Sequence, residues 1–397
     1  MAKSLDLYVI CTDGSKYARG FAYADEGFIL DTYDLQGHKK LVADLCVDPS
    51  YTLSGVACCG IDVAPTVAMV AQTAGLRGIP LAVAQRTHNK GAVREALSNA
   101  ELDIYQPRYL LVAGDYSTDL RANAIGERGI LGGFPIIVKP LEQRASRGVS
   151  IVNNKQELHE AVDKALDYGE EYLLEEYLTG TEHSIEGIFG EDGELMWFNI
   201  VDRLFTYKHG LAIEIGHVNP TSIDIHMQPR FHLMFLAAAR ALDVSWGAFK
   251  IDAILTEDGP KILEVTSRLS GGWDSQGTSP LIGRHPMRML IQLSCGMPID
   301  EQPQMRQANG YAACAAILPQ KSGVVPWLPM YSDTVDVKFA IKPGDVIAPA
   351  CHNGARSGFV LAHADTYDEA WKKAHDVAQE LATIIETKMI GEGEQSG

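Results

Sequence analysis

The sequence lacks the features that mark secreted, membrane and nucleic-acid-binding proteins. Its seven cysteines are odd in number and include no Cys-x-x-Cys pair, which favours buried thiols in a reducing cytoplasm. No window holds the roughly 18 consecutive apolar residues of a membrane span, and the first residues have no long apolar run typical of a signal peptide. The net charge is −17, with no basic stripe for a nucleic-acid backbone. We therefore expect a cytoplasmic protein with no membrane and no nucleic-acid partner.

Several common enzyme signatures are also missing. No Gly-x-Gly-x-x-Gly follows the first expected strand, and no Walker loop occurs, so a dinucleotide fold and a P-loop fold are unsupported. The patterns Gly-x-Ser-x-Gly and His-Glu-x-x-His are absent, so neither of these motifs supports a hydrolase function. What remains is an ordinary globular composition, 46% apolar and 21% charged over 397 residues, long enough for two or three domains.

The first 88 residues alternate between strand and helix signals. Apolar runs predict strands over residues 5–12, 27–31 and 53–59, and helical spacing predicts a helix over 65–75. Repeated βα units imply a small parallel sheet with helices on its faces. We therefore expect an N-terminal α/β domain over residues 1–88.

The rest of the chain has the mixed pattern of α+β domains. In the expected domain 89–300, helices are predicted over 90–100, 115–128, 155–168 and 229–242, and strands over 109–113, 134–140, 149–152 and 172–178. In the expected C-terminal α+β domain 301–390, strands are predicted over 310–318 and 334–341, and a helix over 366–389. The polar residues 391–397 are expected to form a disordered tail.

The most informative segment is Phe249–Arg268, which predicts a β-hairpin around the turn Glu257-Asp258-Gly259-Pro260. Asp252 and Glu264 would then meet across the hairpin. Two carboxylates that face each other among apolar residues repel unless a cation lies between them. Magnesium takes one or two carboxylates and lets phosphates supply the rest, so this pair predicts a Mg²⁺-triphosphate site. The alternative is a surface hairpin with solvated acids.

Two more segments could contact a nucleotide. Lys139 ends an apolar strand, and the loop after it carries Ser146, Arg147 and Gly148, which could offer hydroxyl, guanidinium and backbone N–H groups to phosphates. The alternative is an exposed basic turn. Farther on, the strand that ends near residues 175–178 could hydrogen-bond an adenine edge through its backbone, and a charged hairpin turn is the alternative there.

In this order, the segments resemble the ATP-grasp superfamily. The matching residues are Asn89-Lys90, Ile137–Pro140, Ser146–Val149, Leu174–Tyr177, Gly180–Glu182, Ile251-Asp252 and Leu263–Arg268. Gly344–Val346 and Ala362–Ala370 are similar to the closing domain of the branch that contains biotin carboxylase and L-amino acid ligases. The resemblance implies an ATP-grasp fold in which ATP lies between two α+β lobes, with a mobile lid over about 107–172.

The resemblance also implies residue roles. Catalysis would involve Arg268, beside the reacting phosphoryl group, and Lys139. ATP would be contacted at its phosphates by Lys90 and Lys139, at its adenine by Glu175, Glu176, Tyr177 and Leu178, and at its ribose by Glu182. Asp252 and Glu264 would hold Mg²⁺, for which Mn²⁺ can substitute. Thr266 stands where the family usually has an asparagine metal ligand, and a hydroxyl is a weaker neutral ligand, so a second metal position is left open.

Most members of this superfamily join a carboxylate to an amine through an acyl phosphate. We therefore expect an ATP-dependent carboxylate–amine ligase that acts on small molecules, with a homodimeric state left open. A small-molecule kinase of the same fold, or a non-catalytic ATP-binding protein, remains as an alternative.

Two segments are candidates for the acceptor site. One runs from residue 201 to residue 220, is expected as a polar loop leaving a strand, and contains Arg203 and His217. The other follows Arg268 and contains Gly271, Gly272 and Trp273, where glycine N–H groups could bind an oxyanion. His217 could be a structural histidine or a catalytic base, and Trp273 could cover a substrate or belong to the core.

Overall fold

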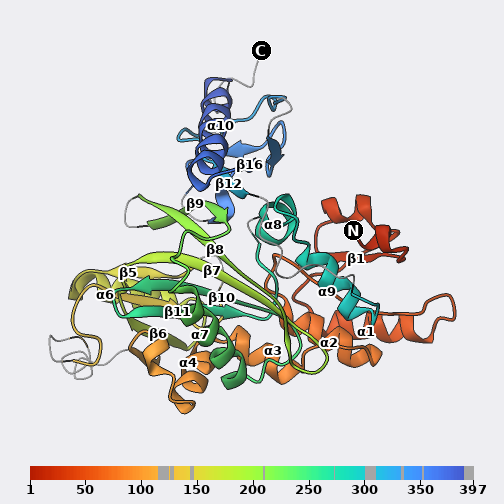
Figure 1. The fold of residues 1–397 in the computed structure, drawn as a ribbon, viewed down its shortest axis with the longest axis horizontal. Coiled ribbons are helices and arrows are strands. Elements are labelled where there is room, and N and C mark those ends of the chain that lie inside the picture. The colour runs from red at the N-terminus through yellow and green to blue at the C-terminus, as the bar shows by residue number, and fades with distance from the viewer. Residues whose placement is uncertain are drawn as a thin grey trace.

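The computed structural model describes residues 1–114, 125, 129–143, 147–208, 211–271, 273–299, 310–331, 335–350 and 353–388. Figure 1 shows a central layer of sheets, a group of helices along its lower side, and a C-terminal unit of strands and a long helix at the top. Within the described ranges, no helix has a stretch long and apolar enough to cross a membrane.

The N-terminal unit is an α/β arrangement with a shorter sheet than the sequence predicts. Strands β1 (Ile10–Asp13) and β2 (Glu26–Ile29) pair in parallel, and helices α1 (Leu35–Val47), α2 (Ala64–Ala74) and α3 (Leu81–His88) follow. The short 3₁₀ helices η1 (Ala2–Leu5) and η2 (Arg19–Tyr23) flank β1. The predicted helix over 65–75 is confirmed.

The predicted third strand over 53–59 is wrong. Only Cys59 makes a bridge, to Leu269, and the rest of the segment joins no ladder. Its apolar residues pack instead against the C-terminal part of α9 (Pro286–Ser294): an added Cβ on Gly55 would lie 2.8 Å from both Cys295 Sγ and the Ser294 backbone. Burial of a short apolar run against a helix leaves the same sequence pattern as a buried strand.

The next unit holds a four-stranded antiparallel sheet in the order β3-β6-β4-β5. Its strands are β3 (Tyr109–Ala113), β4 (Ile136–Pro140), β5 (Ser150–Val152) and β6 (Glu171–Glu176), and its helices are α4 (Lys90–Asn99) and α6 (Lys155–Leu166) with the short η3 (Asp103–Tyr105). These confirm the predicted elements. The predicted helix over 115–128 lies, apart from Ile125, outside the described residues.

The largest sheet has eight strands in the order β11-β10-β7-β8-β9-β12-β16-β14. Its first five strands are β7 (Thr181–Phe189), β8 (Leu195–Lys208), β9 (Leu211–Asn219), β10 (Gly247–Thr256) and β11 (Gly259–Thr266). The hairpin β10–β11 confirms the prediction, and Asp252 is the Cα partner of Glu264. The expected polar loop over 201–220 is wrong, because β8 and β9 form another antiparallel hairpin.

Alternation along the strands gives this sheet two different faces. On one face Ile185, Phe249, Ile251 and Val265 are buried in a cluster with Phe231 and Phe235 of helix α7 (Gln228–Ala241). On the other face the register brings charged residues into neighbouring rows: Asp252 with Glu264, Glu182 with Arg203, and Arg203 with His217. Because side chains on adjacent strands at the same register share a face, the polar row lies together.

The C-terminal unit extends the same sheet. Strands β12 (Tyr311–Ile317), β16 (Gly358–Ala364) and β14 (Asp336–Phe339) continue it beyond β9, and helix α10 (Tyr367–Lys388) packs its alanines and leucines on them. The remaining elements are the pair β13 (Gly323–Val324) and β15 (Val346–Ile347), the π-helix η4 (Asp274–Thr278), α8 (Ser279–Leu281) and η5 (Asn353–Ala355). The expected tail 391–397 lies outside the described residues.

Candidate functional site

A cavity of about 480 Å³ lies between the four-stranded sheet and the polar face of the eight-stranded sheet. Ten of the residues singled out in the sequence line it: Lys90, Lys139, Glu175, Glu176, Tyr177, Leu178, Glu182, Arg203, Asp252 and Glu264. Its apolar wall comes from Ile137, Val149, Ile151, Phe205, Ile254 and Leu263. A cavity with one apolar wall and several converging charges suits a ligand that has both a ring and anionic groups.

Lys139 is held at the bottom of this cavity by a buried ion-pair cluster. Its Nζ lies 2.6 Å from Glu175 Oε2, and Arg94 Nε lies 2.8 Å from Glu175 Oε1. Burial lowers the pKa of Lys139 to about 8, since the Glu175 carboxylate only partly offsets the lost hydration. Burial opposes the charge on Glu175 as well, but Arg94 and Lys139 outweigh it and hold the pKa of Glu175 below its usual value. A bound anion would therefore stabilise the charged form of Lys139.

The segment after β6 forms the entrance side of the cavity. Glu176 pairs with Arg108, whose Nη2 lies 2.6 Å from Glu176 Oε2, so this carboxylate is directed to β3 rather than to a ligand. Tyr177, Leu178 and Gly180 then leave the strand and line the cavity. Gly180 has to be glycine here, because a Cβ would lie 2.0 Å from the carbonyl oxygen of Leu255.

Protein cations neutralise the two carboxylates of the β10–β11 hairpin. Glu264 Oε1 lies 2.8 Å from Lys90 Nζ. Asp252 Oδ1 lies 2.5 Å from Lys250 Nζ and 3.2 Å from Arg203 Nη1. Burial would raise the pKa of Asp252, but Arg203 and Lys250 overcome it and keep the pKa below its usual value. These cations show that the carboxylates attract positive charge.

The donor set fits one magnesium ion. In the part of the chain that the structure describes, no three His, Cys, Asp or Glu side chains form a ready metal cage. Magnesium does not need one, because it binds through one or two carboxylates and takes its remaining oxygens from phosphates and water. Asp252 and Glu264 provide that pair.

Glu182 lies at the edge of the cavity next to these carboxylates. Its Oε2 is 3.2 Å from Arg203 Nη1. Burial raises the pKa of Glu182 to about 7, because the attraction of Arg203 does not fully offset the loss of hydration and the nearby charge of Asp252. A carboxyl group with this pKa is a ready partner for hydroxyl groups of a ligand.

Three predicted ligand residues lie elsewhere. Arg268 is fixed by a two-point contact with Asp62 of the N-terminal unit, at 2.9 Å and 3.1 Å. Thr266 lines a small adjoining cavity of about 20 Å³, whose wall also includes Lys90 and Glu264. Gly148 has φ +72°, and a Cβ would lie 2.8 Å from the Tyr168 ring, so its glycine is needed for packing. Ser146 lies outside the described residues.

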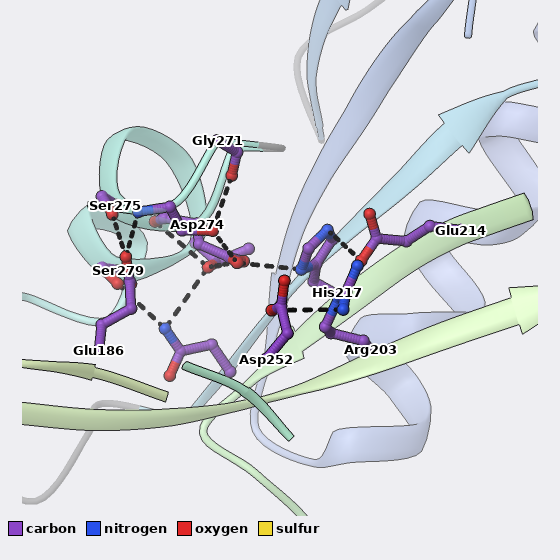
Figure 2. A network of polar contacts seen from close by, with 12 residues as sticks. Glu186, Arg203, Glu214, His217, Asp252, Gly271, Asp274, Ser275 and Ser279 are labelled. Atoms are coloured by element: carbon purple, nitrogen blue, oxygen red, sulfur yellow. Dashed lines mark hydrogen bonds and ion pairs between the residues drawn. The ribbon is translucent and has the colours of Figure 1, made fainter. Parts of the chain in front are cut away.

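A second, more deeply buried network begins at Arg203 (Figure 2). Arg203 Nε lies 2.5 Å from Glu214 Oε1, and Glu214 Oε2 lies 3.2 Å from Arg356 Nη1. His217 lies between two carboxylates, with Nε2 3.4 Å from Glu214 and Nδ1 3.0 Å from Asp274. Arginine, histidine and carboxylates thus alternate from Asp252, which lines the cavity, to Asp274 in η4.

The surroundings of His217 decide between its two interpretations. Burial opposes a charge on the imidazole, but Asp274 and Glu214 more than offset this and raise the pKa of His217 to about 10. At neutral pH the ring therefore carries two protons and has no lone pair for a proton. The catalytic-base interpretation is disfavoured, and His217 acts as a buried cation that orders two carboxylates.

The segment after Arg268 leads into the same network. Trp273 is in the left-handed region, with φ +73°, and its ring lies 6.1 Å from Phe359 in an edge-to-face contact. Glu186 accepts hydrogen bonds from the Ser270 N–H and from Ser275 Oγ at 2.9 Å. A Cβ added to Gly271 would lie 3.0 Å from the Gly60 carbonyl oxygen, and Gly272 lies outside the described residues. Trp273 is therefore partly a packing residue of the C-terminal unit.

Sequence reasoning missed several participants. They are Asp62, Arg94, Glu214, Lys250, Asp274, Asn353 and Arg356. A signal existed for Lys250, an isolated lysine in an apolar strand two residues before Asp252. No local signal marks Asp62, whose partner Arg268 is 206 residues away.

Comparison with protein families finds two matches. Residues 132–276 match the ATP-grasp domain, and residues 330–386 match the L-amino acid ligase C-terminal domain 2. The first range contains most of the cavity residues, and the second contains η5 and α10.

Three individual proteins illustrate how similar known sequences and structures are to this chain. An uncharacterized protein of Sinorhizobium fredii is 25% identical over 81% of this chain and 66% of its own length. D-alanine–D-alanine ligase of Geobacillus thermodenitrificans is 27% identical over 45% of this chain and 50% of its own length. The L-amino acid ligase of Bacillus licheniformis has a similar structure, with a TM-score of 0.76 and 19% identity, covering 96% of this chain and 93% of that one. The chain thus spans between half and two thirds of these two curated sequence relatives, and the structural likeness establishes the fold.

Proposed function

We propose that this chain, which belongs to the ATP-grasp superfamily and carries an L-amino acid ligase C-terminal domain, is an ATP-dependent ligase that joins a carboxylate to an amine. The observation that carries the proposal is the pairing of Asp252 with Glu264 at a cavity that Lys90 and Lys139 also line. Beside it lies the charged network around Arg203 and Glu214, which offers a second binding region for an acceptor.

ATP would bind in the 480 Å³ cavity. The adenine would lie against the apolar wall, next to the backbone of Tyr177 and Leu178, and Glu182 would accept the ribose hydroxyls. Lys90 and Lys139 would turn to the phosphates, which offer more negative charge than their present carboxylate partners. Phosphate binding would stabilise the charged form of Lys139, whose pKa of about 8 otherwise leaves it close to titration.

Asp252 and Glu264 would hold Mg²⁺, or Mn²⁺ in its place. The ion would supply charge neutralisation for the transferring phosphoryl group. Lys90 and the Nη1 of Arg203, which now face these carboxylates, would be released toward the phosphates when the ion binds.

The reaction would take place in two steps. A carboxylate oxygen of the first substrate attacks the γ-phosphorus, and the bond to ADP breaks. The amine then attacks the acyl carbon, loses a proton and displaces phosphate. Such transfers need positioning and charge more than a covalent catalyst. Arg268, held in one orientation by Asp62, would stabilise negative charge on the transferring phosphoryl group and on the developing acyl phosphate.

The network from Arg203 to Asp274 would form the acceptor side. It contains cations and carboxylates within 3.4 Å of one another, so its net charge is small and its geometry is fixed. Charges of this kind suit a zwitterionic or amino-acid-like substrate, whose ammonium and carboxylate groups need partners of both signs. Gly271, Gly272 and Trp273 would border this region.

The proposal extends to the domain limits, a lid and the metal ion. We propose the domain limits 1–88, 89–300 and 301–390, a lid over about 107–172 that closes on nucleotide, and Mg²⁺ as the physiological ion. A homodimer and a cytoplasmic location also stay predictions.

The test is product analysis with a panel of carboxylates and amines. A ligase releases ADP and phosphate only when both substrates are present, and the two become linked. A kinase would instead give a stable phosphorylated product from one substrate, and a non-catalytic protein would give neither. Glu264→Gln, which removes one metal carboxylate, serves as the negative control for every positive pair. ADP release that is equal in the wild type and in this variant and needs neither substrate would show a contaminating ATPase.

A further inference from the structure

Lys250 is a buried cation that none of the predicted roles uses. It lies on β10, two residues before Asp252, and its side chain is 8% exposed. Its Nζ contacts Asp252 Oδ1 at 2.5 Å. Its Cα partners across the sheet are Glu186 on β7 and Thr266 on β11, so Lys250 occupies the row next to the Asp252–Glu264 pair on the same face.

The residues around Lys250 do not fit a second divalent ion. The position two residues after Glu264 holds Thr266, whose buried Oγ1 finds no hydrogen-bond partner among the residues that the structure describes. A hydroxyl is a weaker neutral ligand than an amide carbonyl. The space that Thr266 lines beside Glu264 is about 20 Å³, which suits about one water.

Lys250 differs from the other cations at these carboxylates. Lys90 and Arg203 contact them from other strands or helices and also line the nucleotide cavity, so both can turn to phosphates. Lys250 shares a strand with Asp252 and is enclosed between β7 and β11. A fixed ammonium in this row repels a second divalent ion and supplies positive charge in its place.

We propose that the ε-ammonium of Lys250 replaces a second divalent ion, so that the nucleotide binds with a single metal per chain. The inference rests on the proposed ATP site, and it refines that site by giving its metal stoichiometry. It also accounts for Thr266, because a position that holds no metal does not require an amide ligand.

The experiment measures bound Mn²⁺ rather than turnover. The full chain is saturated with the non-hydrolysable analogue AMP-PNP, and bound Mn²⁺ and bound nucleotide are counted by equilibrium dialysis. Electron paramagnetic resonance then distinguishes an isolated Mn²⁺ from two exchange-coupled ions. The variants are Thr266→Asn and the double variant Lys250→Ala/Thr266→Asn. Lys338→Met, on the exposed β14, is the matched control.

We expect one Mn²⁺ per bound nucleotide and an uncoupled spectrum in the wild type, in Thr266→Asn and in Lys338→Met. The double variant should bind two ions and show exchange coupling, because it loses the ammonium and gains an amide. Two ions in the wild type, with nucleotide bound, would overturn the role of Lys250 and leave the ligase proposal standing. A double variant that folds, binds nucleotide and still takes one ion would also overturn it. A wild type that binds no nucleotide would overturn both.

Discussion

The proposed nucleotide side and the proposed acceptor side of the site differ in how their charges are neutralised. On the nucleotide side, Glu264 pairs with Lys90, and their side chains are 35% and 13% exposed. On the acceptor side, His217 and Glu214 are 3% and 6% exposed and belong to a closed network. The first pair is open to exchange for metal and phosphate, whereas the second is fixed before any ligand arrives.

This difference separates residues that would contact a ligand from residues that stabilise the folded structure around the site. Loss of a partner in an exposed pair costs little stability, while loss of one partner from a buried network costs about 3–5 kcal/mol because it leaves an unpaired charge. We therefore expect nucleotide-side substitutions to change activity with a stable fold, and acceptor-side substitutions to change stability and its pH dependence.

The largest effect is expected for Glu264→Gln. It removes one of the two charges that would bind the metal, so turnover should fall by about 10³-fold or more. The melting temperature should stay close to that of the wild type, since Glu264 is partly exposed. The measurement is ADP release beside a thermal melt. Glu257→Gln, at the exposed tip of the same hairpin, is the control and should be fully active.

Glu264→Gln with near-wild-type turnover would remove the metal assignment. Asp252→Asn should reduce turnover less. One carboxylate can still hold the ion through phosphate oxygens.

A smaller loss is expected for Arg268→Lys. An ammonium cannot make the two-point contact that the guanidinium makes with Asp62, so kcat should fall about 10²-fold while the Kd for ATP changes less than about threefold. The comparison of kcat with ATP affinity is the measurement, and Arg240→Lys, at the exposed end of α7, is the control. Equal losses in both quantities would assign Arg268 to ATP binding alone.

His217→Gln tests the acceptor side through pH. The pKa of His217 is raised from 6.5 to about 10, so its stabilising contribution is complete below pH 6.5 and is lost as pH rises toward 10. The contribution of Lys139 to stability changes with pH in the opposite direction. Because its pKa is lowered from 10.5 to about 8, this contribution rises as pH increases from about 8 to 10.5. The difference in unfolding free energy between wild type and variant isolates His217, and it should shrink by up to about 4 kcal/mol between pH 7 and pH 10.

Denaturant titrations at four pH values give this difference. His226→Gln, an exposed histidine, should leave the pH profile unchanged. A pH-independent difference for His217→Gln would mean that the imidazole is neutral in the folded protein.

The smallest effect is expected for Asn353→Ala. The Oδ1 of Asn353 accepts the Glu214 N–H at 3.0 Å and lines the cavity from the C-terminal unit. Loss of this bond should destabilise the folded protein by about 1 kcal/mol, and the less firmly held Glu214 should raise the acceptor KM several-fold. Steady-state kinetics in which the acceptor KM rises more than the ATP KM would support this role of Asn353, and an equal rise in both constants would contradict it.

The nucleotide side was predictable because its signals are local. The prediction of the hairpin with Asp252 and Glu264 follows from two apolar runs around a turn, and the structure pairs these two residues across β10 and β11. Helices such as α4 and α6 begin where Asn89 and Asn154 accept hydrogen bonds from the N-terminal turn, a capping signal that is visible in sequence.

The acceptor side was not predictable because its charges are neutralised from distant elements. Arg203, Glu214 and His217 made residues 201–220 look like a polar loop, although they lie on β8 and β9. Their partners Asp274 and Arg356 are far away in the chain. A buried strand can carry charged residues only when other elements neutralise them, and sequence alone does not show those elements.

The most direct test of the ligase account uses a carboxylate substrate labelled with ¹⁸O in both oxygens. If the carboxylate attacks the γ-phosphorus, one labelled oxygen bridges carbon and phosphorus, and it leaves with phosphate when the amine attacks the acyl carbon. The account predicts one ¹⁸O atom in each released phosphate, by mass spectrometry, in the presence of amine, ATP and Mg²⁺. Unlabelled phosphate, or a γ-phosphoryl group that stays on a stable product, would contradict it.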